Sequence, residues 1–325
     1  MSVEQSLAQR AITGTLLVTG RMGTDERLAA MQQIVGDAKI IHCPDKAALA
    51  AAIEEAEIVG GVVPRDLFAR ARSLKWMHSW AAGVDRALYP ELNDSNVILT
   101  CASGNAAHPI AEQGILLILM LQQDVVRALQ QQREHNWKQF THPELFGKTV
   151  GVIGLGDIGL EVVRRAKAFH TRVLGMRRSN TPCPDVDELF PRERLHEMLA
   201  ECDFVVMAAP MTADSAKMIG EAEFRAMKPS AYFINISRGG CVDEAALIRC
   251  MREGWIAGAG IDQPTQKPLP ADSELWDLPN TLLFPAYGGH TLETDERSFD
   301  IFQENLQRYI AGKPLLNVVD PKLGY

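Results

Sequence analysis

A glycine-rich segment in the middle of the chain most constrains the fold. Residues 149–159 read TVGVIGLGDIG, an apolar strand that enters the pattern G-x-G-x-x-G and continues into a helix expected over residues 160–169. This order of strand, turn and helix is typical of a dinucleotide-binding unit. Gly154 permits the tight turn, Gly156 lets the backbone approach a pyrophosphate, and Gly159 lets the helix pack against the strand. The N-terminus of the helix would direct its free N–H groups at the phosphates.

The end of the following strand indicates which dinucleotide is bound. A strand is expected over residues 171–176, and Arg177, Arg178 and Ser179 follow it. Units that bind NAD place a carboxylate about twenty residues beyond the glycines, where it accepts hydrogen bonds from the ribose, whereas arginine suits a 2′-phosphate. No carboxylate stands at this strand end. We therefore predict NADP as the cofactor, with NAD as the alternative if the arginines form only a solvated strand end.

Charge and length limit the class of protein. The 325 residues are 46% hydrophobic, which is enough for a large core and favours two domains. The net charge of −8 and the pI near 5.6 argue against a nucleic-acid partner or an anionic membrane, because no basic stripe is present to neutralise phosphates. We expect no partner of either kind.

Cysteine usage and the first residues favour the cytoplasm. The six cysteines are scattered and form no C-x-x-C pair, so neither a disulfide framework nor a zinc site is indicated, and we expect no metal. The opening residues, MSVEQSL, lack the basic start and apolar core of a signal peptide. The longest apolar run, near residues 115–121, is too short to cross a bilayer.

Strands alternate with helices along almost the whole chain, which favours parallel sheets built from βαβ units. Two such sheets are expected. The strands of the first are predicted at residues 14–19, 38–42, 58–63, 76–79 and 97–100. Those of the second are predicted at residues 149–153, 171–176, 204–207, 232–236, 257–261 and 281–284. Helices are predicted at residues 26–35, 66–71, 110–137 and 298–310, of which the third joins the two sheets and the last returns to the first one.

Several motifs resemble those of the D-isomer-specific 2-hydroxyacid dehydrogenases, a family that includes D-lactate dehydrogenase and the glyoxylate/hydroxypyruvate reductases. The resemblance covers nearly the whole chain. It is carried by LKW at residues 74–76, AGVD at 82–85, IAE at 110–112, GKTVGVIGLG at 147–156, NISRGG at 235–240, GAGID at 258–262 and PLP at 268–270 with LW at 275–276.

The resemblance implies an α/β fold of two Rossmann-like parallel-sheet domains, one flavodoxin-like and one dinucleotide-binding, with the active cleft between them. Residues 1–104 and 291–325 would form the substrate-binding domain, and residues 105–290 the dinucleotide-binding domain. It also implies a homodimer in which the long helix takes part in the interface.

The resemblance further assigns roles to individual residues. Arg238 would grip the carboxylate of a small 2-oxo or 2-hydroxy acid and polarise its carbonyl, because a guanidinium offers two parallel donors to a planar carboxylate. The backbone at Ala82 and Gly83 would hold the same carboxylate, and Trp80 would add an apolar wall. Besides the glycines and the strand-end residues named above, the cofactor contacts implied are Asp157, Ile158, Ala209, Pro210, Ser237, Asp262, which would face the nicotinamide amide, and Gly288.

Two positions depart from the family pattern. Where members read Asp-x-x-x-x-Glu-Pro-Leu, this chain has Lys267 in place of the glutamate. Where members read Pro-His, it has Ala286 in place of the histidine. In the family that histidine delivers a proton to the carbonyl oxygen and the glutamate holds it, so both members of the acid–base pair are absent. A positioned general acid contributes about 10²–10⁴ in rate.

Three nearby groups are candidates to replace the missing acid. Lys267 would serve if a dry pocket or a neighbouring arginine lowered its pKa. Tyr287, beside the vacated position, offers a phenolic proton, although it could simply fill the space. His290 would need the loop to bend back, and otherwise lies at the surface or at an interface. We place them in that order, Lys267 first.

Three classes of function follow. The first is an NADP-dependent oxidoreductase acting on a small 2-oxo or 2-hydroxy carboxylate with a substitute proton donor, which we favour. The second keeps hydride transfer but needs no carbonyl acid, as in reduction of an already protonated imine or oxidation of formate or phosphite. The third is a catalytically silent protein that senses NADP(H). Such a sensor has no obvious need for Arg238.

Overall fold

Two parallel sheets, each covered by helices, divide the chain. The computed structural model describes residues 12–84, 87–178 and 181–320. Two compact units are formed, Met1–Asn105 with His290–Tyr325 (unit 1) and Ala106–Gly289 (unit 2). Each boundary lies one residue from the predicted one. The prediction of two parallel-sheet α/β domains is confirmed.

Unit 1 contains a five-stranded sheet in the order β2-β1-β3-β4-β5, with every pair parallel. This is the flavodoxin-like order. The strands are apolar and mostly buried because helices cover both faces of the sheet. The strands are β1 (Thr15–Thr19), β2 (Ile40–Cys43), β3 (Ala56–Gly60), β4 (Trp76–Ser79) and β5 (Ile98–Cys101).

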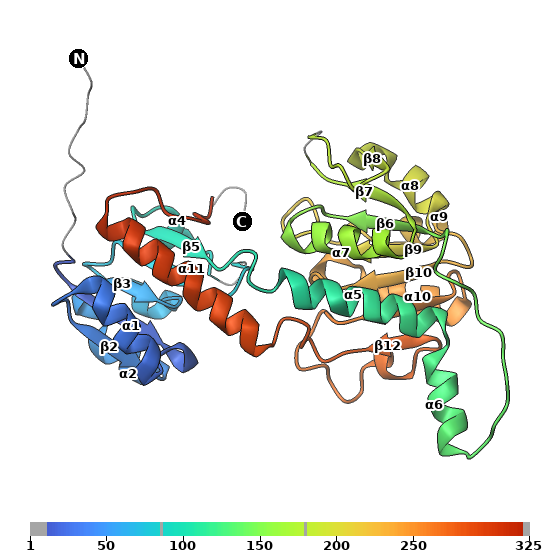
Figure 1. Cartoon of the computed structure of the whole chain (residues 1–325), viewed down its shortest axis with the longest axis horizontal. Coiled ribbons are helices and arrows are strands. Elements are labelled where there is room, and N and C mark those ends of the chain that lie inside the picture. The colour runs from blue at the N-terminus through green and yellow to red at the C-terminus, as the bar shows by residue number, and fades with distance from the viewer. Residues whose placement is uncertain (1–11, 85–86, 179–180, 321–325) are drawn as a thin grey trace. The chain divides into compact units, whose positions relative to one another are not determined.

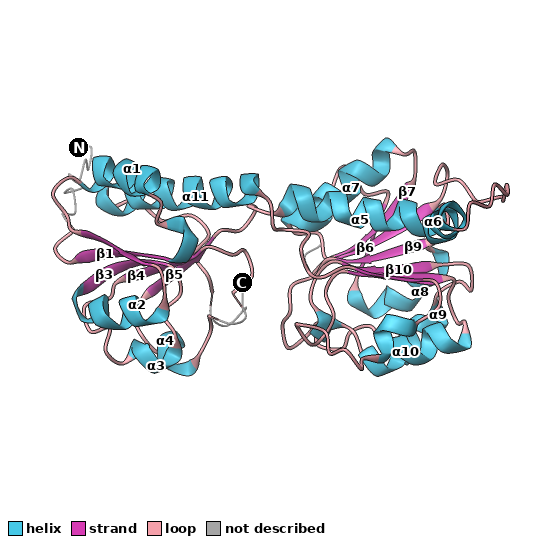
Figure 2. Ribbon diagram, turned by 90° about the horizontal axis from the view of Figure 1, so that it is seen from below, coloured by secondary structure: helices cyan, strands magenta, loops and turns pink. Residues whose placement is uncertain are grey.

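Two helices cover one face of this sheet and three short helices cover the other (Figure 2). The first pair is α1 (Asp25–Val35) and α11 (Leu292–Ile310), and the others are α2 (Lys46–Ala52), α3 (Arg65–Phe68) and α4 (Pro90–Asn93). Helix α11 begins six residues before the predicted start because the Thr291 hydroxyl caps it, accepting from the backbone N–H of Thr294. Short 3₁₀ helices lie at Gly20–Met22 and Ile53–Glu55.

Unit 2 contains a seven-stranded parallel sheet in the order β12-β11-β10-β9-β6-β7-β8 (Figure 1). Numbered from the glycine-rich strand, this is the order of dinucleotide-binding folds, extended by one strand. The strands are β6 (Thr149–Ile153), β7 (Arg172–Met176), β8 (Glu188–Phe190), β9 (Phe204–Met207), β10 (Tyr232–Asn235), β11 (Gly258–Ile261) and β12 (Thr281–Leu283). The sequence did not predict β8, which has only three residues and begins with a charged one.

Helices α5 (Ala107–Gln122) and α7 (Asp157–Ala168) cover one face of this sheet (Figure 2). The other face is covered by α8 (Leu195–Glu201), α9 (Glu221–Ala226) and α10 (Glu244–Glu253). Short 3₁₀ helices lie at Arg192–Arg194, Gly239–Cys241 and Glu274–Asp277. No helix in the described ranges is long and apolar enough to cross a membrane.

The single long helix predicted over residues 110–137 is wrong. The chain forms α5 and then α6 (Val125–Arg133), because Asp124 adopts a left-handed conformation with φ 50° between them. The Asp124 carboxylate accepts from the backbone N–H of Arg127 and so starts the second helix. No α6 residue is buried, and this helix projects from the body of unit 2 (Figure 1).

Candidate functional site

The carboxyl ends of the strands in unit 2 bring together most of the predicted cofactor residues. Strand order reverses between β6 and β9, and ligands of open parallel sheets bind at such a switch point. Gly154 and Gly156 lie in the loop after β6, Gly159 lies in the first turn of α7, and the loop after β9 carries Ala209 and Pro210. Strands β10 and β11 follow β9 in the sheet. Arg238 lies three residues after the end of β10, and Asp262 directly follows β11.

The three glycines of the turn serve different purposes. Gly154 has φ 95°, and a Cβ there would lie 2.5 Å from the backbone N and Cα of Ala209. A Cβ at Gly159 would lie 1.9 Å from the Gly154 carbonyl oxygen, so α7 packs against the turn only with glycine. A Cβ at Gly156, however, would meet no protein atom within 4 Å, and its φ of −87° suits any residue. The fold does not require glycine at position 156, whereas a ligand that lay close to this backbone would.

The first turn of α7 has the features of an anion site. Its N-cap is Gly156, which has no side chain to cap the helix, and Asp157 and Ile158 are the first two helical residues. The first N–H groups of a helix have no partner within the helix and carry a partial positive charge. Residues at this turn therefore fit the pyrophosphate of a dinucleotide.

Arg177 and Arg178 come directly after β7. Arg177 is half-buried and Arg178 is exposed, and the Arg178 guanidinium lies 3.2 Å from an exposed carboxylate oxygen of Asp214. Sequence reasoning did not anticipate this ion pair. Its exposure makes it weak, so it does not prevent Arg178 from pairing with another anion. Ser179, also predicted to contact the cofactor, lies outside the described residues.

A buried asparagine holds the backbone of Arg238 at the carboxyl end of β10. The Asn235 side chain donates to the backbone carbonyls of Arg238 at 3.3 Å and Gln263 at 3.2 Å, and its own carbonyl accepts from the Ser237 N–H. The Ser237 hydroxyl donates in turn to the Ala209 carbonyl. The loops after β9, β10 and β11 are thereby linked to one another, and Arg238 is left half-buried.

The Asp262 carboxylate is 1% exposed and is held by two glutamine side chains. Gln113, on α5, donates from Nε2 to Oδ1 at 2.8 Å, and Gln263 donates from Nε2 to Oδ2 at 2.5 Å. Gly288 lies beside this group, because a Cβ there would be 1.6 Å from Oε1 of Gln113. Neither glutamine was predicted from the sequence, although a polar residue within the apolar run of α5 was a usable signal for Gln113.

The three candidate proton donors occupy different surroundings. Lys267 is exposed, and its ammonium donates to Oε1 of Gln263, which links it through that amide to Asp262. Tyr287 is 47% exposed, and its ring packs on Phe284 with centroids 5.5 Å apart. His290 is exposed and belongs to unit 1.

Ala286, at the position assigned to the missing histidine, has φ 57°. A non-glycine residue in the left-handed region is uncommon and costs on the order of 1 kcal/mol or more. The loop that carries Tyr287 and Gly288 therefore has a strained backbone at its start, held by the surrounding packing.

Unit 1 carries the predicted substrate residues other than Arg238. Trp80 follows β4, and its ring meets His78 and Phe302 edge-on at centroid distances of 5.4 and 4.9 Å. Gly60 makes room for that ring, because a Cβ there would lie 2.8 Å from it. Ala82 is half-buried and Gly83 is exposed in the following loop. Burial lowers the pKa of His78 to about 3, so this imidazole is neutral.

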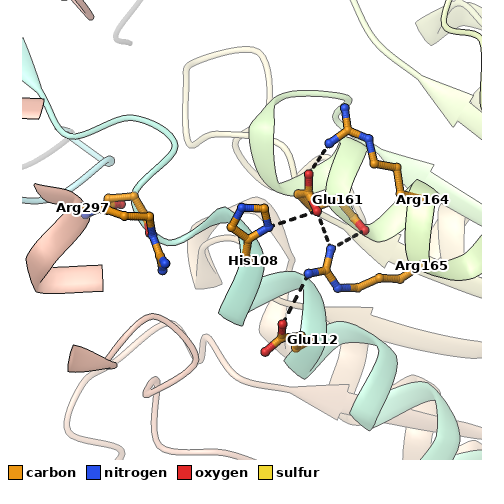
Figure 3. Close-up of polar contacts among 7 residues, drawn as sticks. His108, Glu112, Glu161, Arg164, Arg165 and Arg297 are labelled. Atoms are coloured by element: carbon orange, nitrogen blue, oxygen red, sulfur yellow. Dashed lines mark hydrogen bonds and ion pairs between the residues drawn. The ribbon is translucent and has the colours of Figure 1, made fainter. Parts of the chain in front are cut away.

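A charged cluster joins α5 to α7 (Figure 3). Glu161 accepts from Arg164, Arg165 and His108, the last at 3.1 Å, and Arg165 also lies 3.3 Å from the Glu112 carboxylate. Burial raises the pKa of Glu161, but hydrogen bonds from Arg165 and His108 bring the net value below the usual one. The figure also labels Arg297 of unit 1, whose Nε donates to the Asn105 carbonyl.

The cluster gives His108 and Glu161 structural partners, which sequence reasoning did not identify. Within the described ranges, no group of three or more histidine, cysteine, aspartate or glutamate side chains is placed to hold a metal ion.

A glycine turn at the switch point of a parallel sheet, with an uncapped helix beyond it, defines a dinucleotide-binding α/β protein. Residues 115–288, more than half of the chain, match the family model described as D-isomer specific 2-hydroxyacid dehydrogenase, NAD binding domain. The chain belongs to this family.

Named relatives support the same assignment. A glyoxylate reductase of Korarchaeum cryptofilum is 34% identical over 270 residues, 80% of each chain. A glyoxylate/hydroxypyruvate reductase B of Pectobacterium atrosepticum is 34% identical over 272 residues, 81% of this chain and 84% of the relative. Among solved structures, an NADPH-dependent glyoxylate/hydroxypyruvate reductase from Sinorhizobium meliloti, in complex with NADP and sulfate, has a TM-score of 0.84 at 28% identity and covers 96% of this chain and 100% of its own.

Proposed function

We propose that the protein is an NADPH-dependent reductase of small 2-oxo carboxylates, with glyoxylate and hydroxypyruvate as the first substrates to test. The observation that carries the proposal is Arg238, whose backbone carbonyl accepts from Asn235 at the same carboxyl end of the sheet as Asp262 and the glycine turn. A guanidinium placed there suits a planar carboxylate. The solved relative from Sinorhizobium meliloti is an NADPH-dependent reductase, which supports the same chemistry.

The choice of NADP rests on the arginines after β7. Arg177 and Arg178 follow the strand where NAD-binding units carry a carboxylate. The exposed partner of Arg178, Asp214, would be exchanged for a 2′-phosphate on binding, since an exposed ion pair contributes little. Preference for NADPH over NADH is therefore expected, with residual use of NADH.

In the proposed reaction the bound nicotinamide supplies a hydride to the carbonyl carbon. Arg238 grips the substrate carboxylate and polarises the carbonyl, and Trp80, Ala82 and Gly83 of unit 1 are the other proposed substrate contacts. A proton must reach the carbonyl oxygen to complete the alcohol. Lys267 is the preferred donor because Gln263 ties its ammonium to Asp262, the residue proposed to face the nicotinamide amide. Tyr287 and His290 remain the other candidates.

A second function is favoured by Ala286 and Lys267, which stand where the family's acid–base pair is expected. Without that pair the protein would still transfer hydride to a substrate that needs no proton from the enzyme, such as a protonated imine, or from formate or phosphite. A catalytically silent NADP(H)-binding protein is the third possibility, and Arg238 weighs against it.

We also propose a cytoplasmic homodimer. No residue of α6 is buried. Val126 and Leu129 of this helix are exposed, and Trp137, shortly after it, is 97% exposed. Exposed apolar side chains in one segment are typical of an interface. Light scattering at several protein concentrations tests this, and a mass of one chain throughout would contradict it.

Steady-state NADPH oxidation by the purified protein tests the function, with glyoxylate, hydroxypyruvate, pyruvate and bulkier 2-oxo acids as substrates and NADH in parallel. The proposal is supported if NADPH is oxidised faster than NADH with one of these substrates and if this activity is lost in Arg238→Gln. Arg249→Gln is the control, since this exposed arginine pairs with Glu221 on another surface. Silence across the panel, with NADPH shown to bind, would overturn the reductase proposal and leave the other two functions.

A further inference from the structure

One amide oxygen of unit 2 is buried without a donor at the proposed nicotinamide site. Gln113 is 5% exposed, and its Nε2 donates to Oδ1 of Asp262 at 2.8 Å. An ionised carboxylate only accepts hydrogen bonds, so this contact requires the nitrogen to face Asp262 and the oxygen to face away. Among the residues that the structure describes, that oxygen, Oε1, has no hydrogen-bond partner.

The surroundings of this oxygen show where it points. A Cβ at Gly288 would lie 1.6 Å from Oε1 of Gln113 and 3.6 Å from Oδ2 of Asp262, so both acceptors converge on Gly288. Gly288 belongs to the loop after β12, at the carboxyl edge of the sheet. A buried carbonyl without a donor is costly to the fold, and a ligand N–H group that reached this oxygen would remove that cost. Because the oxygen is buried against Gly288, the loop that carries Gly288 would have to shift to admit such a group.

We propose that Gln113 is a cofactor-contact residue whose amide oxygen accepts a hydrogen bond from the carboxamide –NH₂ of the nicotinamide. This inference rests on the cofactor site of the proposed function. The carboxamide nitrogen has two N–H groups, one for Asp262 and one for Gln113. The Asp262 carboxylate keeps lone pairs for such a bond beyond those used by the two glutamines.

The same helix supplies a matched control. Gln122 is also a buried glutamine of α5, 3% exposed, and its Oε1 likewise has no partner in the described part of the chain. Its Nε2 donates to the Pro143 carbonyl. It lies nine residues, or roughly 13 Å, further along the helix axis. Replacing either glutamine by methionine removes one buried orphan oxygen and one amide donor, but only Gln113 is beside Asp262.

The test compares the binding of NADP⁺ with that of its 3-acetylpyridine analogue, in which a methyl group replaces the carboxamide –NH₂. Calorimetry gives the ratio of the two dissociation constants without any need for turnover. The wild type should prefer NADP⁺ by about tenfold or more, since a neutral hydrogen bond such as the one to Gln113 contributes about two- to tenfold and one to a carboxylate about tenfold or more. Gln113→Met should reduce this preference by about fivefold, and Gln122→Met should leave it at the wild-type value.

A second comparison separates a direct contact from an effect relayed by Asp262. In an Asp262→Asn background, Gln113→Met should lower the preference for NADP⁺ further. An unchanged ratio there, or full preference in the Gln113→Met single variant, would overturn the inference while leaving the proposed function standing. Failure of the wild type to bind either dinucleotide would overturn both.

Discussion

Replacing Gly156 by alanine should separate cofactor binding from folding. The added methyl group would meet no protein atom within 4 Å, and the backbone φ of −87° is ordinary for alanine. The free energy of unfolding without cofactor should therefore change by no more than about 1 kcal/mol, because the chain entropy that glycine loses on folding is offset by the poorer fit of alanine to the N-cap position. The methyl group would instead occupy space that the pyrophosphate needs.

The expected loss of affinity follows from the hydrogen bonds at stake. A backbone N–H that donates to a charged phosphate contributes about 1.5–3 kcal/mol. Holding the phosphate away from one such donor should weaken NADPH binding by roughly 10- to 150-fold. The stabilisation by cofactor would shrink accordingly, since a ligand at 100 times its Kd stabilises by about 2.7 kcal/mol.

Thermal unfolding with and without NADPH, together with calorimetric titration, measures both effects. Gly159→Ala is the contrasting variant, because its methyl group would lie 1.9 Å from the Gly154 carbonyl oxygen. It should lower the unfolding temperature of the apoprotein, at a cost of about 1–3 kcal/mol or more. Wild-type affinity for NADPH in Gly156→Ala would refute the placement of the pyrophosphate at this turn.

Three further outcomes are expected. His78 should weaken the fold in acid: its pKa is about 3 when buried and 6.5 when unfolded, so between these pH values only the unfolded chain binds the proton, and stability falls by about 1.4 kcal/mol per unit as pH drops. Urea unfolding between pH 7 and pH 4 should show that the free energy of unfolding falls less steeply with acidification in His78→Leu than in the wild type. Equal slopes would contradict this. The double variant Arg177→Ala/Arg178→Ala should lose tenfold or more of the preference for NADPH while its Kd for NADH stays within threefold, and an unchanged preference would exclude these arginines as 2′-phosphate ligands. Lys267→Met should lower kcat by about 10²–10⁴-fold without changing the Kd for NADPH. If Tyr287→Phe or His290→Gln shows that loss instead, the residue replaced in that variant is the proton donor.

The regular elements could be predicted from local sequence. Short apolar runs separated by helical periodicity predicted both parallel sheets, and G-x-G-x-x-G placed the turn between β6 and α7 within a few residues. These features depend on neighbours in the chain, so their signals survive in one sequence. The interruption at Asp124 was missed because the spacing of apolar residues does not reveal that one side chain ends the first helix and caps a second one.

The hydrogen bonds between side chains of the site could not be predicted in this way. Gln113 and Asp262 are 149 positions apart, and the sequence around one residue does not indicate a contact with the other. Asn235 joins the Arg238 and Gln263 carbonyls only because β10 and β11 are neighbours in the sheet.

The sequence by itself therefore predicted the two sheets, apart from β8, and the glycine turn, and it led to the hypothesis that the arginines after β7 bind a 2′-phosphate. The tertiary structure decided that Asp262 lies between two glutamines, that Lys267 reaches it through an amide, and that one glutamine oxygen is buried without a donor. The physical reason is that helices and strands follow from periodicity over a few residues. Hydrogen bonds between distant side chains depend instead on the strand order and helix packing that bring them together.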